Sequence, residues 1–228
     1  GVGVLPMPTE LGGAGAPSWV YAEAVARVAA ACGATSTVYM TQLHCAHPIH
    51  LRGTDEQHRK WIPALCAGEA IGAIALTEPD SGSDVASMRT TARLDGDEYV
   101  INGAKIFISN GDRADVIVLF ATVDPGAGKD GITAFLLDTK TLSGFRAGAP
   151  MGKLGQRGAS TVELSFDDCR IPVSARLGDE GQGYSLLLDS VTKSRISAAA
   201  QGVGFAQGAF DATVARFAQL GLLSARAR

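Results

Sequence analysis

Residues Ala75 to Ser87 read "ALTEPDSGSDVAS". The apolar run before them ends at Leu76, and a dense group of hydroxyl and carboxylate side chains follows around two turn-forming residues, Pro79 and Gly82. A plain turn uses only two or three such residues. A loop with this many short polar groups is typical of a chain that bends around a polar ligand.

The segment before this loop is predicted to be helical. From Ser18 to about Gly68, apolar residues recur at helical spacing, and one stripe at four-residue spacing contains Val20, Ala24, Val28 and Cys32. A second helix is expected to begin at Thr54, because Thr54 and Gln57 form a capping-box pattern. It ends at Gly68, and its apolar face consists of Trp61, Ile62 and Leu65.

From about Ala73 to Pro172 the pattern changes to that of β-strands. The stretch "LDGDEYVINGAKIFISNGD" contains three turn signals in quick succession: Asp95-Gly96, Asn102-Gly103 and Asn110-Gly111. Further strands are predicted at "VIVLFATV", "ITAFLLD" and "TVELSFDD", with a loop from Pro125 to Gly131. These patterns predict a β-domain of about a hundred residues.

After Gly183 the helical period returns and no proline interrupts it, which predicts one long helix to about Gln219. Its apolar positions are Leu187, Val191, Ala199, Val203, Phe210, Val214 and Phe217. We therefore expect an α+β protein with an N-terminal helical domain (1–73), a middle β-barrel or sandwich domain (74–178) and the start of a C-terminal helical bundle (179–228). Because the chain lacks an initiator Met and stops before a helix covers the last one, we expect a piece of a longer polypeptide.

Composition excludes several classes of function. The chain of 228 residues is 46% hydrophobic and 19% charged, as in an ordinary globular protein. Its net charge of −3, with Lys and Arg scattered, argues against nucleic acid as a partner. No apolar run approaches the roughly 20 residues of a membrane-spanning helix. The N-terminus lacks the pattern of a signal peptide, so a cytoplasmic location is expected.

The cysteines and histidines favour no metal site. Four cysteines without a framework spacing are typical of reduced thiols. Residues 44–50, "HCAHPIH", resemble a metal-binding cluster, but zinc sites of this kind need a second ligand group, and the sequence has none. Pro48 is also expected to disturb the following helical turn. Half-buried helix residues are therefore the favoured interpretation.

The polar loop resembles the signature loop of the acyl-CoA dehydrogenase family. "GTDEQHRKWIPALCAGE" is similar to the family's segment before that loop, "DEYVINGAKIFISNG" to its next hairpin, and "GQRGASTVELSFDDCRIPVSARLG" to the end of its β-domain. The segments follow one another in the family's order, over most of residues 1 to 210. The resemblance implies a fragment that lacks most of the C-terminal helical domain and the first N-terminal helices.

The resemblance implies an FAD enzyme of fatty acid or amino acid catabolism. Such an enzyme oxidises an acyl-CoA thioester to a trans-2-enoyl-CoA and passes the electrons to an electron-transferring flavoprotein, and relatives are commonly homotetramers. Alternatives are an acyl-CoA oxidase or flavin monooxygenase of the same fold, or a truncated member without catalytic activity. The sequence leaves these alternatives open.

The resemblance also implies a set of flavin-binding residues. These are Leu76, Thr77, Gly82 and Ser83 in the loop, with Phe107 and Ser109 in the hairpin. Backbone N–H groups in the bend and the Thr77 hydroxyl suit the polar edge of an isoalloxazine ring. The chain departs from the family pattern at Ile74, where an aromatic residue is usual, and at Phe107, where Trp is usual. As an alternative, Phe107 is a core strand residue.

For the substrate, the resemblance implies that Arg195 supports the CoA moiety, with Thr192 one turn earlier and Ser83 on the thioester side. A solvated helix arginine is the alternative for Arg195. The catalytic carboxylate is expected beyond Arg228, because Ser194 occupies the position where a subset of relatives carries it. The chain alone is therefore expected to be inactive, with Glu78 and Asp84 assigned to loop structure.

Overall fold

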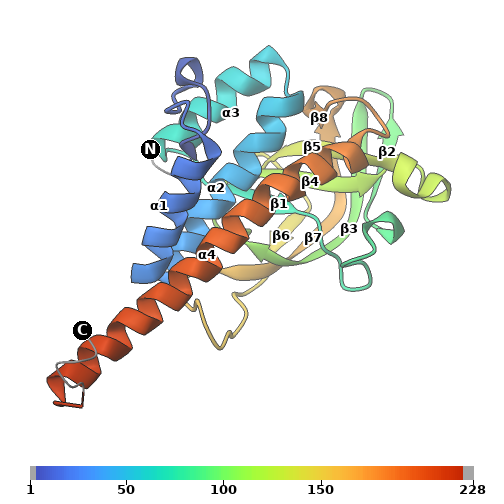
Figure 1. The fold of residues 1–228 in the computed structure, drawn as a ribbon. Coiled ribbons are helices and arrows are strands. Elements are labelled where there is room, and N and C mark those ends of the chain that lie inside the picture. Colours follow the sequence, from blue (N-terminus) through green and yellow to red (C-terminus); the bar gives the residue numbers. More distant parts are fainter. Residues whose placement is uncertain (1–3, 223–228) are drawn as a thin grey trace.

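The N-terminal layer consists of three helices. The computed structural model describes residues 4–222, and after a short 3₁₀ turn, η2 (Thr9–Leu11), it contains α1 (Ser18–Ala31), α2 (Gly33–Arg52) and α3 (Asp55–Ala67) (Figure 1). Extended backbone at Cys32 separates α1 from α2, a break that the sequence pattern did not predict. The predicted start of α3 is confirmed, since Thr54 and Gln57 form a capping box. Gly68 ends the helix in the left-handed conformation that favours glycine.

The buried face of α1 differs by one position from the predicted stripe. Its buried residues are Tyr21, Val25 and Ala29, whereas Val20, Ala24 and Val28 are half-buried and Cys32 is exposed. α1 and the long C-terminal helix α4 (Gly183–Gln219) also approach each other closely. A Cβ on Gly204 of α4 would lie 2.2 Å from the Ala26 carbonyl oxygen, so the two helices meet on small residues.

Eight strands follow, in one hydrogen-bonded sheet. They are β1 (Gly72–Ala75), β2 (Thr91–Asp95), β3 (Glu98–Ser109), β4 (Val116–Thr122), β5 (Ile132–Asp138), β6 (Phe145–Ala147), β7 (Thr161–Pro172) and β8 (Arg176–Leu177). Short 3₁₀ turns, η3 (Val85–Ser87), η4 (Pro125–Gly131) and η5 (Val173–Ala175), connect some of them. The predicted strands are confirmed, and the predicted loop before β5 is η4.

The sheet folds into two halves that enclose a core. One half has the order β6-β7-β3-β2 and the other contains β1, β4, β5 and β8, and they join through the single parallel pair Thr91–Thr122. Ile101 and Leu164 from one half pack with Leu119 and Phe135 from the other. β4 is buried on both faces because its alternate residues pack against the helices. That burial explains its unbroken apolar sequence.

One predicted turn inside the β-domain is wrong. Asn102 and Gly103 lie within β3, at an irregularity in its pairing with β7, and Gly103 has a φ of 144°. The Asn102 side chain exchanges two hydrogen bonds of 2.9 Å with Asp168 of β7, which fastens the irregularity. The dipeptide therefore forms a bulge here, where the sequence pattern indicated a hairpin turn.

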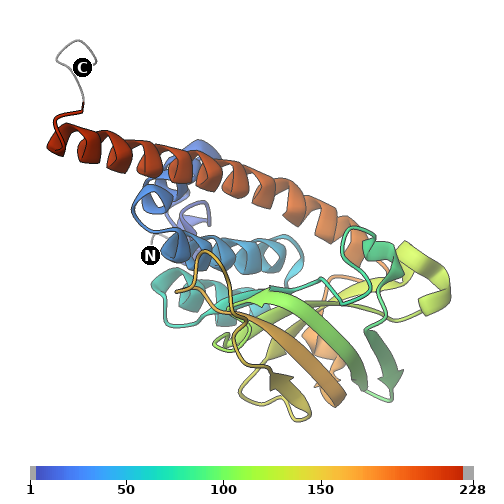
Figure 2. The same ribbon diagram turned by 90° about the horizontal axis from the view of Figure 1, so that it is seen from below.

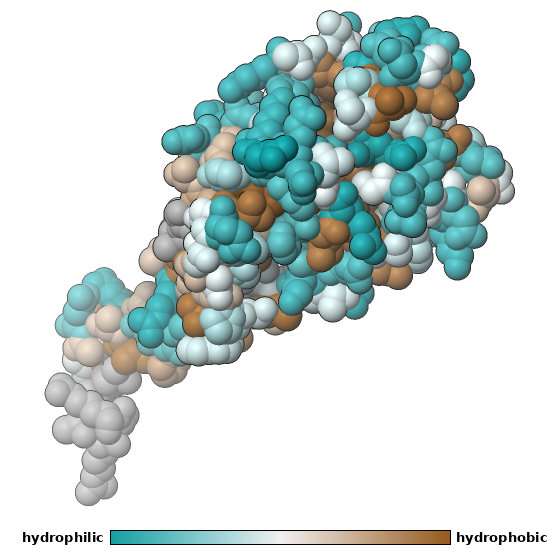
Figure 3. Space-filling view, turned by 90° about the horizontal axis from the view of Figure 1, so that it is seen from above, coloured by the Kyte–Doolittle hydropathy of each residue, from teal (hydrophilic) through white to brown (hydrophobic). Residues whose placement is uncertain are grey.

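The long helix α4 (Gly183–Gln219) confirms the prediction for the C-terminal part. α2 packs against both α4 and β1, and Figure 2 shows the end of α4 projecting beyond the other helices. Apolar side chains on that end, including Phe210 and Phe217, are exposed, and Figure 3 shows apolar patches among polar residues there. Within residues 4–222, no helix has the length and apolar character needed to cross a membrane.

Candidate functional site

The polar loop begins with a tight turn at the end of β1. Glu78 and Ser81 exchange two backbone hydrogen bonds, with Pro79 and Asp80 at the corners, where proline and aspartate fit a turn. The Ser81 hydroxyl is buried and donates to the Asp84 carbonyl oxygen at 2.7 Å. Part of the unusual polar content of the loop therefore serves to fold it.

Glu78 fastens this loop to β3. Its carboxylate accepts hydrogen bonds from the backbone N–H groups of Arg89 and Thr90, at 2.6 and 2.9 Å, and pairs with the Lys105 ammonium at 2.8 Å. Lys105 Nζ also donates to the Leu76 carbonyl oxygen at 2.9 Å. The side chains of Lys105 and Glu78 are 0% and 4% exposed, so we call this buried ion pair the loop clamp.

Both partners of the loop clamp are charged at neutral pH. Burial by itself would raise the pKa of Glu78, but Lys105 and the hydrogen bonds from Thr90 and Arg89 outweigh it and hold that pKa below its usual value. Burial lowers the pKa of Lys105 to about 8, against the opposing attraction of Glu78. Glu78 is therefore occupied as a structural anion, as the sequence analysis expected.

Phe107 lies in a bulge of β3 next to the clamp. Between Lys105 and Ile108 the pairing with β7 shifts by one residue, and Phe107 has a φ of 61°. Left-handed backbone is strained for an aromatic residue. Its side chain is 62% exposed. The alternative of a core strand residue is therefore wrong, and the bulge presents an aromatic ring at the surface.

The loop and the bulge lie directly against each other. The Ile106 N–H donates to the Thr77 carbonyl oxygen at 2.8 Å, and a Cβ on Gly82 would lie 4.0 Å from the Thr77 methyl group. Gly82 and Ser83 are exposed. Within residues 4–222, the hydroxyl groups of Thr77, Ser83 and Ser109 have no hydrogen-bond partner. The residues predicted from the loop and from the hairpin thus form one surface with unused hydroxyl groups.

The structure places Thr192 and Arg195 at a different position, on an exposed face of α4. The Thr192 hydroxyl donates to the Leu188 carbonyl oxygen at 2.8 Å. In the described part of the chain, neither residue forms a hydrogen bond or ion pair with the polar loop. The connection is indirect, because α4 packs on η4, which packs on η3 of the loop.

The sequence analysis assigned no role to a polar network that links α2, α4 and the segment before β7. The Thr37 hydroxyl donates to Gln156 Oε1, and Gln201 Nε2 donates to the hydroxyls of Ser36 and Thr37, at 2.8 and 3.0 Å. Gln156 occurs in "GQRGAS", which begins a segment quoted for the resemblance, and Gln201 occurs in "AAAQGVG" of α4. Only the folded structure shows that both glutamines bind side chains of α2.

The histidine segment lies within α2, which continues through Pro48 to Arg52. The expected disturbance by Pro48 therefore does not end the helix. Burial, with a contribution from His47, lowers the pKa of His44 to about 4. Among the described residues, no group of three His, Cys, Asp or Glu side chains is arranged to hold a metal ion.

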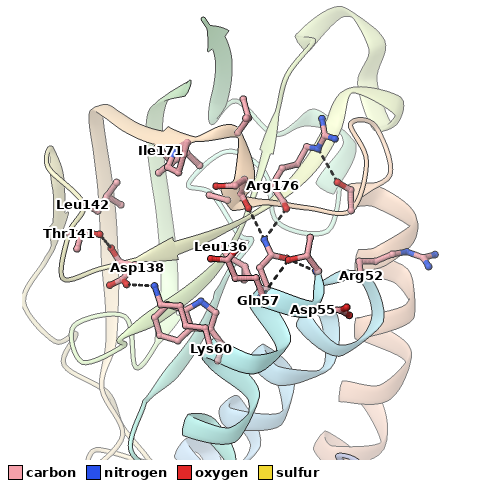
Figure 4. A pocket seen from close by; sticks show the side chains of 18 of the residues that line it. Arg52, Asp55, Gln57, Lys60, Leu136, Asp138, Thr141, Leu142, Ile171 and Arg176 are labelled. Atoms are coloured by element: carbon pink, nitrogen blue, oxygen red, sulfur yellow. Dashed lines mark hydrogen bonds and ion pairs between the residues drawn. The ribbon is translucent and has the colours of Figure 1, made fainter. Parts of the chain in front are cut away.

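A cavity of about 850 Å³ lies elsewhere, between α3, β5, β7 and the segment around η5 (Figure 4). Some of its polar groups pair with other lining residues: Lys60 with Asp138 at 2.9 Å, and Gln57 Nε2 with the carbonyl oxygens of Ser174 and Arg176, at 3.0 and 3.1 Å. None of the predicted site residues lines it. This cavity therefore lies apart from the candidate site.

Comparison with known proteins identifies the fold. Residues 1–69 match the model of the acyl-CoA dehydrogenase N-terminal domain, and residues 73–169 match that of the middle domain. The chain is 43% identical over 208 residues to a short-chain specific acyl-CoA dehydrogenase of Clostridium acetobutylicum, covering 91% of this chain and 55% of that protein.

Two solved structures share the fold. Butyryl-CoA dehydrogenase from Megasphaera elsdenii has a TM-score of 0.90 and 35% identity, over 94% of this chain and 57% of that one. A chain from a structure described as the electron transferring flavoprotein of Acidaminococcus fermentans has a TM-score of 0.91 and 39% identity, over 94% and 56%. The chain spans about half the length of the curated relatives it matches. Both domain models and the three-part architecture agree, and the chain belongs to the acyl-CoA dehydrogenase family.

Proposed function

We propose that the whole protein containing this chain oxidises an acyl-CoA thioester between its α and β carbons, with FAD as cofactor and a flavoprotein as electron acceptor. The observation that carries the proposal is the junction of the polar loop with the strained bulge of β3. At that junction the loop, with the unused hydroxyls of Thr77 and Ser83, is hydrogen-bonded to the bulge that carries the exposed Phe107 ring and is followed by Ser109. The acceptor is supported by the similarity to a chain in the flavoprotein structure from A. fermentans.

The residues at this junction fit the isoalloxazine ring of FAD. Phe107 offers an aromatic face, and Thr77 and Ser109 offer hydroxyl donors for the polar edge of the ring. Gly82 lets the backbone approach closely, with Leu76 and Ser83 beside it. When bound, FAD would supply the two-electron acceptor for the oxidation. The chain's part is to orient the ring and to stabilise the negative charge that develops on it.

The residues that we propose for substrate binding lie on α4 and in the loop. Arg195 is exposed and forms no ion pair within residues 4–222, so its guanidinium is available to a phosphate or carbonyl oxygen of CoA. Thr192 lies on the same face of the helix, and Ser83 would face the thioester. The α-proton must leave to a desolvated carboxylate. Glu78 is occupied by the clamp and Asp84 is exposed, so we expect that base outside these 228 residues.

Anaerobic spectroscopy of the whole protein tests the proposal. We expect it to purify yellow with FAD and to bleach when butyryl-CoA is added. A colourless protein that takes up no added FAD contradicts the proposal. Rapid reoxidation by air, without a need for a flavoprotein acceptor, would instead indicate an oxidase.

A Phe107→Ala variant tests the junction itself. Covering the exposed ring with a flavin stabilises the complex by on the order of 1.4 kcal/mol, so FAD should bind about tenfold more weakly. Folding stability should change little, because Ala in left-handed backbone is strained much as Phe is. Leu94→Ala, on another exposed apolar residue of the same sheet, is the matched control and should leave FAD affinity unchanged. Equal FAD affinity in both variants would exclude Phe107 from the flavin site.

A further inference from the structure

A second cavity, of about 430 Å³, lies between the first described residues and the helices α1, α2 and α4. We call it the helix pocket. None of the residues proposed for FAD or acyl-CoA lines it. Binding of a ligand in the helix pocket is therefore separate from the proposed dehydrogenation. It can occur whether or not the proposed function is correct.

The walls of the helix pocket are mainly apolar. Met7, Leu43 from α2 and Ile196 from α4 supply them, and a few polar groups interrupt them. Pockets that bind small molecules have this composition, with volumes of about 300 to 1,000 Å³. A molecule of water occupies about 30 Å³ in the liquid, so the helix pocket has room for on the order of ten heavy atoms.

Two buried polar atoms on lining residues lack a partner. Within residues 4–222, neither the Tyr21 hydroxyl nor His50 Nδ1 has a hydrogen-bond partner in good geometry, although the Ser197 hydroxyl lies close enough to Tyr21 to oppose the effect of burial on the Tyr21 pKa. A buried polar group without a partner destabilises a protein by about 1 to 3 kcal/mol. Tyr21 as a whole is 3% exposed. A polar ligand at this wall would be stabilised by supplying the missing hydrogen bonds.

The charge of the helix pocket favours an anion. Lys193 lines it, is exposed to solvent, and forms no ion pair or hydrogen bond with any residue from 4 to 222. Burial, together with Lys193 and His50, lowers the pKa of the neighbouring His47 to about 4 against the opposing effect of Asp189, so this imidazole is neutral at neutral pH. Asp189, one turn before Lys193, does not itself line the pocket. One cation and neutral hydrogen-bonding groups therefore face an apolar space.

We propose that the helix pocket binds a small amphipathic carboxylate, with its alkyl chain against Met7, Leu43 and Ile196 and its carboxylate at Lys193. The ammonium group supplies the opposite charge, and the imidazole groups and the Tyr21 hydroxyl supply hydrogen bonds. A neutral molecule of equal length would fill the apolar space without using Lys193. This difference in charge makes the proposal testable with two probes.

Calorimetric titration of the purified chain with octanoate and with 1-octanol tests the proposal. We expect Lys193→Met, which keeps the apolar stem, to weaken octanoate binding about tenfold and to leave 1-octanol binding within about twofold. Ile196→Trp, which narrows the pocket, should weaken both probes. Lys129→Met, on the exposed η4, is the matched control and should change neither.

Three results would overturn the proposal. The first is the absence of saturable octanoate binding to the unsubstituted chain, and the second is equal octanoate affinity in the Lys193→Met variant. The third is loss of octanoate binding in Arg195→Ala, which would place the carboxylate at the proposed acyl-CoA site. FAD binding is measured separately by absorbance, so failure of the proposed dehydrogenation is distinguishable from failure here. Circular dichroism confirms that each variant is folded.

Discussion

Removing the anion of the loop clamp is the sharpest test of how the polar loop is held. A Glu78→Gln substitution leaves the Lys105 side chain, which is 0% exposed, without its charged partner. The Gln amide nitrogen would also face the Arg89 N–H, a donor that now binds Glu78 Oε2 at 2.6 Å. We therefore expect both a buried, unpaired charge and one conflict between two donors.

The expected loss of stability follows from this burial. Breaking a buried ion pair by removing one partner destabilises a protein by about 3 to 5 kcal/mol, because the remaining charge stays desolvated. Replacing both partners with neutral groups is far less costly. The double variant Glu78→Gln/Lys105→Met should therefore recover at least half of the stability that the single variant loses. Asp80→Asn, in the exposed pair with Arg89, is the matched control and should cost less than about 1 kcal/mol.

Urea unfolding at pH 7 of the unsubstituted protein, Glu78→Gln, Lys105→Met and the double variant gives the free energies for a double-mutant cycle, and Asp80→Asn is measured beside them. FAD affinity of the same variants shows whether the loop loses its shape together with its anchor. A loss below about 1 kcal/mol for Glu78→Gln, equal to that of Asp80→Asn, would refute the reasoning. A double variant that is less stable than the single one would also contradict it.

Three further predictions concern the substrate, the isolated chain and pH. Arg195→Ala in the whole protein should weaken acyl-CoA binding by about 1 to 3 kcal/mol and leave FAD bound; loss of FAD with unchanged KM would assign Arg195 a different role. The 228-residue chain loaded with FAD should not bleach with acyl-CoAs, since a missing base costs at least about 10²-fold in rate; bleaching at the rate of a full-length relative would show a base within it. The pKa of His44 falls from 6.5 to about 4 on burial, so its contribution to stability is full above about pH 6.5 and is lost toward pH 4. This loss amounts to roughly 2 to 3 kcal/mol of unfolding free energy. In His44→Leu, the difference in stability between urea unfolding at pH 7 and at pH 4.5 should shrink by this amount; an unchanged pH dependence would contradict the assignment.

Local patterns were sufficient for most elements of the fold. The capping box at Thr54, the left-handed glycine at Gly68 and the apolar period of β5 depend on neighbouring residues, and each was predicted from them. The break at Cys32 and the bulge at Asn102 were missed. The bulge depends on a contact with Asp168, which is distant in the sequence, and propensity describes only neighbours in sequence.

The candidate site, too, could be predicted only where it depends on neighbouring residues in the sequence. The loop residues were found because so many short polar groups in one bend are unusual, but their separate roles could not be read from composition. Ser81 and Glu78 fold the loop, whereas Thr77 and Ser83 keep their hydroxyls free of other described residues. Lys105 is the partner that gives Glu78 its structural role, but in the sequence it looks like any other lysine of a strand. Its burial follows only from the arrangement of β3 against β1.

The pairing of β3 with β7 determines when this surface can form during synthesis. Ser109 ends β3 and Thr161 begins β7, so the ribosome makes the second strand roughly 50 residues later, a delay of about 3 to 10 seconds. During that interval one edge of the longest early strand has no partner, and open edges of this kind pair readily with other chains. Chaperones that shield nascent strands should therefore improve the yield of soluble chain.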